Sequence, residues 1–334
     1  MKKILFVTLI TVLFSSMTMA QDSSSELLEE YEERFKSEEF TVIMLLQSTA
    51  AFSFQDDDFN GGREFGIGVP LLDFKGALQN NFMYRLQLQL TRTPSVIDAF
   101  VGYRFSEKFR LIAGEKKPFM VLELDPSPAK TDMINRARLV GAMVNARETG
   151  LTFLGDFDDG FYYRAGIYNG TGFSRANDNR FLYTGRVGYK TDDFNIGLNA
   201  SLNRTRSESV GKTGLVSAGD RSLYGAYIKY SGDTIFGTVE FLESQFDLDN
   251  TTLEEKITGF YGTVGYHATE DDDFLLRWDH ISFDVSGIED SDRIVLGWNR
   301  QLTELVSVQV NGLYQINEVS DNQAGVSCNF QFYF

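Results

Sequence analysis

The sequence contains few of the residues that cross-link proteins, bind metals or act as catalytic bases. It has one cysteine, two histidines and five prolines in 334 residues. With only Cys328 available, an intramolecular disulfide framework is excluded. His267 and His280 leave little material for a metal centre or for histidine-based catalysis. We therefore expect no metal and no cofactor.

Long apolar runs are also missing. After residue 20 no stretch reaches the roughly 18 consecutive apolar residues of a membrane-spanning helix. The nearest, 40–54, is interrupted by Gln47, Ser48 and Thr49. The shorter run at 4–14 follows Lys2 and Lys3 and precedes the small-residue site 18–20, which predicts a secretory signal peptide at residues 1–20.

Residues 21–39 form a separate acidic segment. It holds eight Asp and Glu residues. Ser23 and Glu26 have the spacing of a capping box, and Leu27, Tyr31 and Phe35 recur at helical spacing. A short periplasmic helix and a disordered acidic linker are equally compatible with this composition.

From residue 40 onward apolar and polar residues alternate. The pattern is clearest at 84–91, 194–203 and 306–316, where every second side chain is apolar and the others are mostly Asn, Gln, Arg, Ser or Gly. Successive side chains of a strand point to opposite faces, so each segment has one apolar and one wet surface. The 29 Phe and 15 Tyr fit strands placed between lipid and water.

The spacing of these segments predicts an all-β, transmembrane antiparallel β-barrel of about 16 strands over residues 40–334, with 14 or 18 strands also possible. Tight connections at 106–107, 157–159, 191–192, 232, 269–272 and 302 alternate with long ones at 117–144, 205–220, 246–255 and 286–290. Short periplasmic turns and longer outer loops are typical of the bacterial outer membrane. The expected strands are 40–54, 62–77, 82–92, 96–105, 108–116, 145–156, 160–169, 180–190, 193–204, 221–231, 233–245, 256–268, 273–285, 291–301, 303–316 and 323–334.

The last strand carries a further signal. Its apolar face runs from Val326 through Cys328, Phe330 and Phe332 to Phe334, where the sequence stops. An aromatic terminal residue on such a strand predicts recognition by the machinery that inserts barrels into the outer membrane. Trp278, Trp298 and the many tyrosines at strand ends fit aromatic girdles at the membrane interfaces, next to lipid.

No enzyme motif is present. His280 lies near Asp279 and Ser282, but adjacent strand residues face opposite ways, so His280 and Asp279 cannot share a face. The formal net charge is −16, and removal of Lys2 and Lys3 makes it −18. Strong acidity disfavours nucleic acid as a partner. We predict a protein that is not an enzyme.

Basic residues gather in the first third of the barrel. From Arg63 to Arg147 there are 13 Lys and Arg against 8 Asp and Glu, a local net charge of +5. Arg85, Arg104 and Arg110 occupy the faces opposite apolar strand residues, and Arg facing lipid at mid-membrane costs about 2–4 kcal/mol. We therefore expect these three arginines to line the lumen.

The long segment after the fifth strand is expected to fold inward as a third loop and narrow the pore. The predicted anion-binding constriction comprises Lys116, Lys117, Arg136, Arg138 and Arg147, because Arg and Lys replace the hydration of anions and phosphate with charge-assisted hydrogen bonds. Alternatively, these residues pair with acidic neighbours and brace the loop, the candidates being Glu115, Glu123, Asp125, Asp132 and Glu148.

Three short stretches resemble the phosphate-selective porin O/P family. They are Gly114-Glu115-Lys116-Lys117-Pro118-Phe119, Ala146-Arg147-Glu148-Thr149-Gly150-Leu151 and Tyr168-Asn169-Gly170-Thr171-Gly172, in the family's order and spacing. The resemblance implies a sixteen-stranded porin, a homotrimer, and basic residues that guide phosphate or other anions. Pro118 follows Lys117 directly, where the family pattern has an intervening residue.

The sequence thus predicts an outer-membrane porin: a passive, water-filled channel for small hydrophilic solutes that favours phosphate and other anions. A non-selective or cation-preferring porin, with acidic entrance loops at Asp56–Asp58 and Asp284–Asp292, is an alternative. A barrel enzyme or a closed structural barrel is a further one.

Overall fold

The chain forms a closed antiparallel β-barrel. The structure is a computed structural model that describes residues 37–55, 57–79, 81–173 and 179–334. The expected signal peptide and most of the acidic segment, 21–36, lie outside the described residues. Within the described part, no helix is long and apolar enough to cross a membrane.

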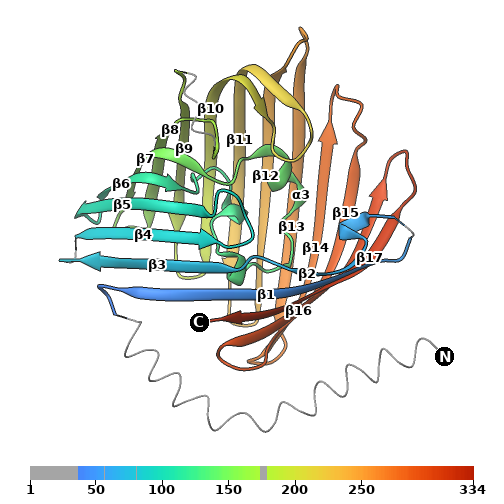
Figure 1. The fold of residues 1–334 in the computed structure, drawn as a ribbon, viewed down its shortest axis with the longest axis horizontal. Coiled ribbons are helices and arrows are strands. Elements are labelled where there is room, and N and C mark those ends of the chain that lie inside the picture. The colour runs from blue at the N-terminus through green and yellow to red at the C-terminus, as the bar shows by residue number, and fades with distance from the viewer. Residues whose placement is uncertain (1–36, 56, 80, 174–178) are drawn as a thin grey trace.

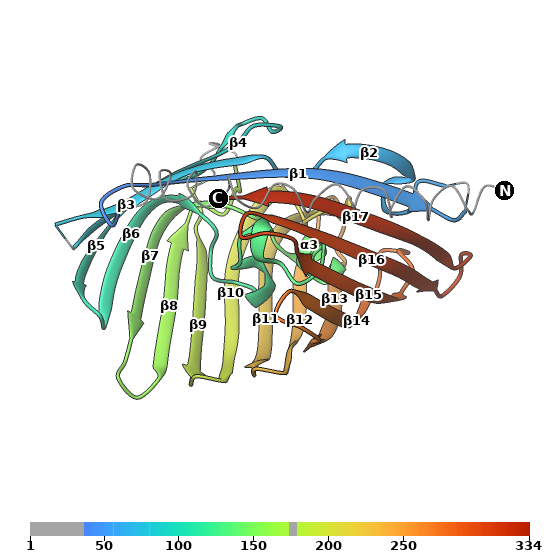
Figure 2. The ribbon, with the colours of Figure 1, turned by 90° about the horizontal axis from the view of Figure 1, so that it is seen from below.

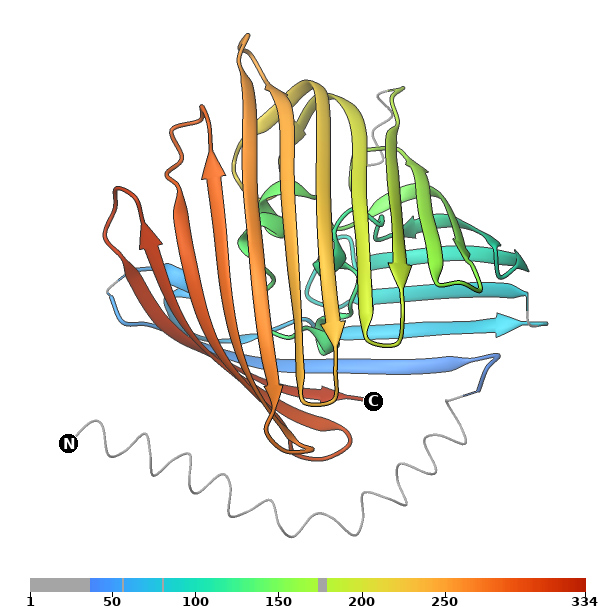
Figure 3. The ribbon, with the colours of Figure 1, turned by 180° about the vertical axis from the view of Figure 1, so that it is seen from behind.

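Apart from β2 and β3, which both pair with β1, each strand pairs with its neighbours in the chain, and the last pairs with the first. The strands wrap around an interior that is visible from both sides in Figures 1 and 3. Their bounds are β1 Thr41–Ser53, β2 Arg63–Ile67, β3 Leu71–Leu78, β4 Phe82–Gln89, β5 Val96–Ser106, β6 Phe109–Lys116, β7 Glu148–Asp156, β8 Phe161–Tyr168, β9 Leu182–Lys190, β10 Phe194–Ser209, β11 Val216–Ser231, β12 Ile235–Leu248, β13 Glu254–His267, β14 Asp272–Phe283, β15 Ser291–Gln301, β16 Val306–Asn317 and β17 Gln323–Tyr333.

The prediction of a sixteen-stranded barrel is confirmed, because β2 and β3 are two parts of one barrel strand. Both pair with β1, β2 with its second half and β3 with its first half. The interruption falls at 68–70, where Gly68 and Pro70 occur. Proline has no backbone N–H to donate to a sheet, which explains why a continuous expected strand, 62–77, is broken there.

The connections alternate in length around the barrel. At one end lie 79–81, 107–108, 157–160, 191–193, 232–234, 268–271 and 302–305, together with the end of β17 and the start of β1. At the other end the connection 117–147 is the longest. The expected long connection 205–220 is wrong, because β10 and β11 continue to Ser209 and Val216 through an irregularity after Thr205.

Burial confirms which face of each strand meets lipid. Outward apolar side chains are widely exposed, as Phe65 at 93% and Leu296 at 63% illustrate, whereas the alternate polar positions are buried in the interior. Cross-strand aromatic pairs gather at the short-turn end, such as Phe161–Tyr189 with ring centroids 5.0 Å apart. This is the distribution of an interfacial aromatic girdle around a lipid-facing wall.

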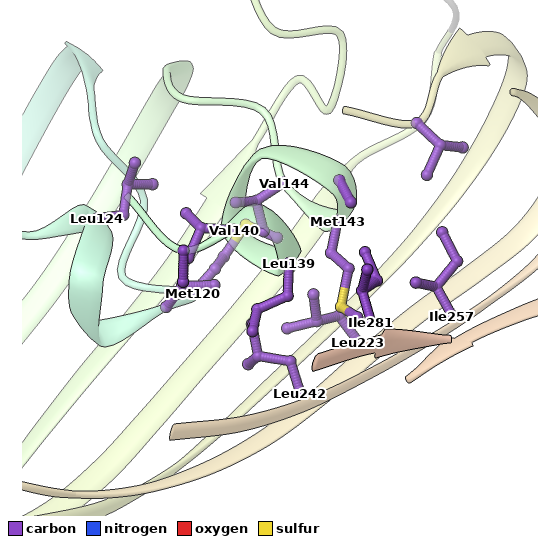
Figure 4. Close-up of a cluster of buried hydrophobic side chains, with 14 of the residues drawn as sticks. Met120, Leu124, Leu139, Val140, Met143, Val144, Leu223, Leu242, Ile257 and Ile281 are labelled. Carbon is purple, nitrogen blue, oxygen red and sulfur yellow. The ribbon is translucent and has the colours of Figure 1, made fainter. Parts of the chain in front are cut away.

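The connection between β6 and β7 folds into the barrel. It contains the 3-10 turns Leu122–Leu124 and Pro128–Lys130 and the helix α3, Arg138–Met143. In Figures 1 and 2 α3 lies between the wall of β1 and β17 and the wall of β11 to β13. Leu139 and Met143 point toward Leu242 of β12, Ile257 of β13 and Ile281 of β14, as Figure 4 shows. Burial of this apolar surface stabilises the docked connection by about 25 cal/mol for each Å² that is removed from water.

Candidate functional site: a basic wall facing an inward-folded loop

The charged side chains that face the interior are unevenly distributed. Strands pair so that opposite residues share a face, which allows the interior positions to be read from the register. On β10–β17 the bases Arg221, Lys229, Arg277 and Arg293 are balanced by Glu208, Glu240, Glu255, Asp273 and Asp279. On β3–β9 eight bases and four acids point into the interior, which gives a net charge of +4. The bases are Lys75, Arg85, Arg104, Arg110, Lys116, Arg164, Arg186 and Lys190, and the acids are Asp73, Asp98, Glu148 and Asp156.

Four of these arginines form two cross-strand pairs. Arg104 lies opposite Arg110, and Arg164 lies opposite Arg186. Directly opposed like charges repel across a sheet. Asp156 relieves part of this repulsion, because its carboxylate is bonded to both Arg110 and Arg164. Two guanidinium groups on one carboxylate leave one positive charge in excess.

A second acidic residue, Asp98, joins two bases. Arg147 donates from Nε to Asp98 Oδ1 at 2.8 Å, and Arg85 Nη1 lies 3.1 Å from Oδ2. Arg85 also donates to both carboxylate oxygens of Asp73, at 2.9 and 2.7 Å. Ion pairs of this kind with buried carboxylates fix the arginines rigidly on the wall.

The start of the inward connection places an aromatic ring among cations. Lys116 is only 8% exposed, and its Nζ lies 4.1 Å from the ring centroid of Phe119. The guanidinium carbons of Arg164 and Arg186 lie 5.9 and 5.6 Å from the same ring. Arg186 is in turn paired with Asp125 of the connection. Cation–π contacts and this ion pair attach the connection to the interior face of β3–β9, which we call the basic wall.

Lys117 and Arg136 converge on a single carbonyl group. Lys117 Nζ donates to Pro126 O at 2.8 Å and to Leu124 O at 2.7 Å, and Arg136 Nη2 donates to Pro126 O at 2.9 Å. Burial, together with the charges of Arg136 and Arg147, lowers the pKa of Lys117 to about 6. Lys117 is therefore mostly neutral at pH 7.5.

The far side of the connection is fastened to the opposite wall. Glu240 of β12 is fully buried and accepts from the backbone N–H groups of Leu122, at 2.6 Å, and Glu123, at 3.3 Å. Arg138 donates from Nε to Asp279 Oδ1 at 2.6 Å. Side-chain amides of β15–β17 bond the backbone in between: Asn299 to Asp132 O, Gln309 to Thr131 O and Gln331 to Ala129 O.

A cavity of about 1200 Å³ opens between the connection and the long-loop end of the barrel. Its lining includes polar side chains of β1, β16 and β17, such as Gln47, Gln315 and Asn329. Arg136 and Arg138 also line it, together with Arg92 of the connection 90–95. We call this cavity the vestibule.

The predicted site residues therefore occupy different places. Arg136 and Arg138 line the vestibule. The other three lie behind it: Lys116 contacts the Phe119 ring, Lys117 is bonded to backbone carbonyl groups, and Arg147 is paired with Asp98. Arg85, Arg104 and Arg110 lie on the interior face of β4–β6. Arg92, Arg164 and Arg186 were missed, although the alternation in 161–168 and 182–190 places Arg164 and Arg186 on the polar face.

A comparison with family models supports the predicted resemblance. Residues 52–190 match the model described as phosphate-selective porin O and P. Over that segment the chain is similar to this porin family. The match contains β2–β9, the strands that carry the basic wall. The predicted resemblance to this family is confirmed over that segment, and so is the location of this porin in the bacterial outer membrane.

Solved porins share the fold of this porin. OmpT, an outer membrane protein of Vibrio cholerae, is 14% identical with a TM-score of 0.69, covering 88% of this chain and 97% of its own. Its trimer form, 13% identical, gives 0.66 over 88% and 99%. The anion-selective porin from Comamonas acidovorans, 14% identical, gives 0.68 over 89% and 99%. At these identities the likeness establishes the fold. No curated protein sequence matches the chain.

Proposed function

We propose that this porin is a passive channel that favours small anions, phosphate among them, and performs no chemical reaction. The net charge of +4 on the interior face of β3–β9 carries the proposal, because a field of one sign inside a low-dielectric wall concentrates the opposite ion. The chain as a whole is acidic, at −16. Its selectivity therefore depends on where the charges lie, and not on their sum.

The basic wall suits phosphate in particular because most of its cations are arginines. A guanidinium group offers five donors in a fixed fork that matches a tetrahedral oxyanion. Arg164 illustrates the arrangement: one nitrogen is bonded to Asp156 at 2.6 Å, and the other contacts are with neutral carbonyls and with the Tyr162 and Phe119 rings. The anion-selective porin from Comamonas acidovorans, which has the same fold, supports the same preference.

The test is the reversal potential of single channels in a KCl gradient, at about 0.1 M salt so that screening is limited. We expect chloride to permeate more readily than potassium. Arg164→Gln removes one lumenal charge while Asp156 keeps Arg110 as a partner. A unit charge about 6 Å from a passing ion contributes about 0.7 kcal/mol at the dielectric constant of water, roughly a threefold change in preference.

The matched control is Arg204→Gln. Arg204 is exposed and pairs with the exposed Asp220, and it lies on the lipid side of β10, because the neighbouring outward residue Leu202 is 55% exposed. This control removes the same charge without touching the lumen and leaves the reversal potential unchanged. A wild-type channel that prefers potassium would refute the proposal and favour the acidic loops as the selective element. Added phosphate that leaves the chloride current unaltered would remove phosphate from it.

We further propose that the barrel assembles as a homotrimer and is inserted through its last strand. The trimer form of OmpT supports the first point, since it has the same fold. For the second, the outward face of β17 carries Phe330 and Phe332, and Phe334 bonds the Met44 backbone in both directions, at 2.8 and 3.1 Å. Deletion of Phe334 is expected to reduce the yield of inserted barrel in cells.

A further inference from the structure

The vestibule is larger than a small inorganic anion needs. Cavities of about 300–1,000 Å³ enclose drug-sized organic molecules, and the vestibule measures about 1200 Å³. It lies at the long-loop end, above the connection that crosses the barrel, so a solute entering from that end meets it before the basic wall. Its size alone therefore allows an organic solute to rest there.

The vestibule is positively charged. Its lining contains four bases, Arg92, Arg136, Arg138 and Lys212, and two acids, Glu208 and Glu289. Arg138 is neutralised by Asp279, and the Glu289 carboxylate accepts from the backbone of the facing loop 318–322. Carbonyl oxygens, which carry no net charge, accept from Arg136 Nε and Nη2 at 2.9 Å. The charge of Arg136 therefore remains available to a solute.

Arg92 adds a cation backed by an aromatic ring. Its guanidinium carbon lies 3.5 Å from the ring centroid of Phe173, which also lines the vestibule. Stacking holds the guanidinium plane flat, as required for bidentate binding of a phosphate or carboxylate. Arg92 and Arg136 thus provide two positioned cations in one cavity.

One part of the lining is apolar. Val140 of α3, Ile281 and Phe283 of β14 and Ile288 of the connection 284–290 lie along this part. Gly141 of α3 also lines the vestibule and leaves open space beside Lys212, because a Cβ atom added there would meet only Lys212 Cδ, at 3.9 Å. Apolar surface of this kind gains nothing from an inorganic ion but binds a hydrocarbon or aromatic group.

We infer that the vestibule binds organic anions in which a phosphate or carboxylate group is joined to an apolar body. The anionic group contacts Arg92 and Arg136, and the apolar body lies over Gly141 against Phe283 and Ile288. In naming the class of solute, this inference rests on the anion preference proposed above. It adds that the channel selects organic anions over inorganic phosphate at its entrance.

The test compares two dianions at pH 8 on the full-length channel in planar bilayers: phenyl phosphate and inorganic phosphate. Both are added to the long-loop side, and the half-blocking concentration for the chloride current is measured. We expect phenyl phosphate to block at a concentration at least tenfold lower. Equal half-blocking concentrations would overturn the inference, because charge alone would then account for binding.

Gly141→Phe tests the location, and Gly141→Ala is its matched control. The phenylalanine occupies the open space above α3, so it raises the half-blocking concentration of phenyl phosphate at least tenfold and that of inorganic phosphate less than twofold. Alanine adds one carbon and changes neither more than twofold. A Gly141→Phe variant that affects both ions equally, or neither, would overturn the placement. Heat-modifiable migration in gels verifies that both variants are folded.

The two proposals fail in different ways. The reversal potential in KCl alone, without either phosphate, decides the anion preference of the channel. An anion-preferring channel with equal block by the two dianions would overturn the vestibule site only. A cation-preferring channel that phenyl phosphate still blocks selectively would overturn the proposed function and retain the site. In Arg92→Gln and Arg136→Gln variants both blocks weaken at least threefold; unchanged block would remove these arginines from the site.

Discussion

Replacing Glu240 with glutamine is expected to release the connection 117–147 from the wall while the barrel stays folded. The Glu240 carboxylate is fully buried and accepts from the N–H groups of Leu122 at 2.6 Å and Glu123 at 3.3 Å. The same carboxylate also accepts from the Tyr261 hydroxyl at 3.1 Å. A glutamine keeps one oxygen as an acceptor and turns its amide N–H₂ toward the other backbone N–H, which is left without an acceptor; a buried donor in that state costs about 1–3 kcal/mol.

The loss of about 1–3 kcal/mol, at about 1.4 kcal/mol per tenfold change, raises the undocked population roughly fivefold to 100-fold. The side chains labelled in Figure 4, among them Leu139 and Met143, still pack against the wall, so undocking is transient. Single-channel recordings are expected to show more frequent steps between conductance levels. Hydrogen exchange at the Leu122 and Glu123 amides is expected to accelerate by the same factor.

Glu255→Gln is the matched control for this variant. Glu255 is equally buried in the same wall, and its Oε1 alone accepts from the backbone N–H groups of Asp284, at 2.9 Å, and Val285, at 3.1 Å. A glutamine can keep both bonds through its amide oxygen, so this control removes a buried carboxylate from the same wall without accelerating exchange in 117–147. If Glu240→Gln left both the recordings and the exchange of Leu122 and Glu123 at wild-type levels, the carboxylate would not be what holds the connection.

Three further predictions follow from single positions. Because burial and two arginines lower the pKa of Lys117 to about 6, Lys117→Gln leaves ion preference unchanged at pH 7.5 but reduces anion preference at pH 5, measured as reversal potential. Hydrogen bonds from Ser320 and Val319 lower the pKa of Glu289 below its ordinary value. The contact between the two outer loops therefore persists at pH 5 and is lost only as the pH falls through that lowered pKa. Distances between labels on cysteines introduced in the two loops, in a background without Cys328, measure this contact. Gly114 has φ +136° and a Cβ there would lie 2.2 Å from a backbone carbonyl, so Gly114→Ala destabilises the barrel by about 1–3 kcal/mol in urea titrations, whereas Gly185→Ala, with open space around it, does not.

The strands were predictable because a lipid-facing barrel imposes a strict period of two. At Phe330 and Asn329 the two faces differ in solvent, lipid on one side and a polar interior on the other, so sequence alternation is enough to assign them. The ends of the strands were harder to predict from the sequence. β10 and β11 extend beyond the membrane-facing alternation through Thr205 and Ser217, whose hydroxyl groups bond each other at 3.0 Å. Such a contact depends on register and leaves no periodic mark in the sequence.

The excess of positive charge at the candidate site could be predicted from the sequence, but the contacts of its side chains could not. An excess of bases between Arg63 and Arg147 follows from counting, and alternation places Arg85 on the interior face.

Which bases stay available depends on partners far away in the chain. Arg138 meets Asp279 of β14, whereas Arg136, two residues earlier, meets only carbonyls of its own connection. Arg138 is the first residue of α3, whereas Arg136 lies before the helix, so the docking of α3 against β14 decides which cation is neutralised. The selective field of this porin is consequently set by how one connection lies against two walls. A variant that shifts that connection, such as Glu240→Gln, is therefore expected to change ion preference through the position of its bases, in addition to the effect of the interior acid that it removes.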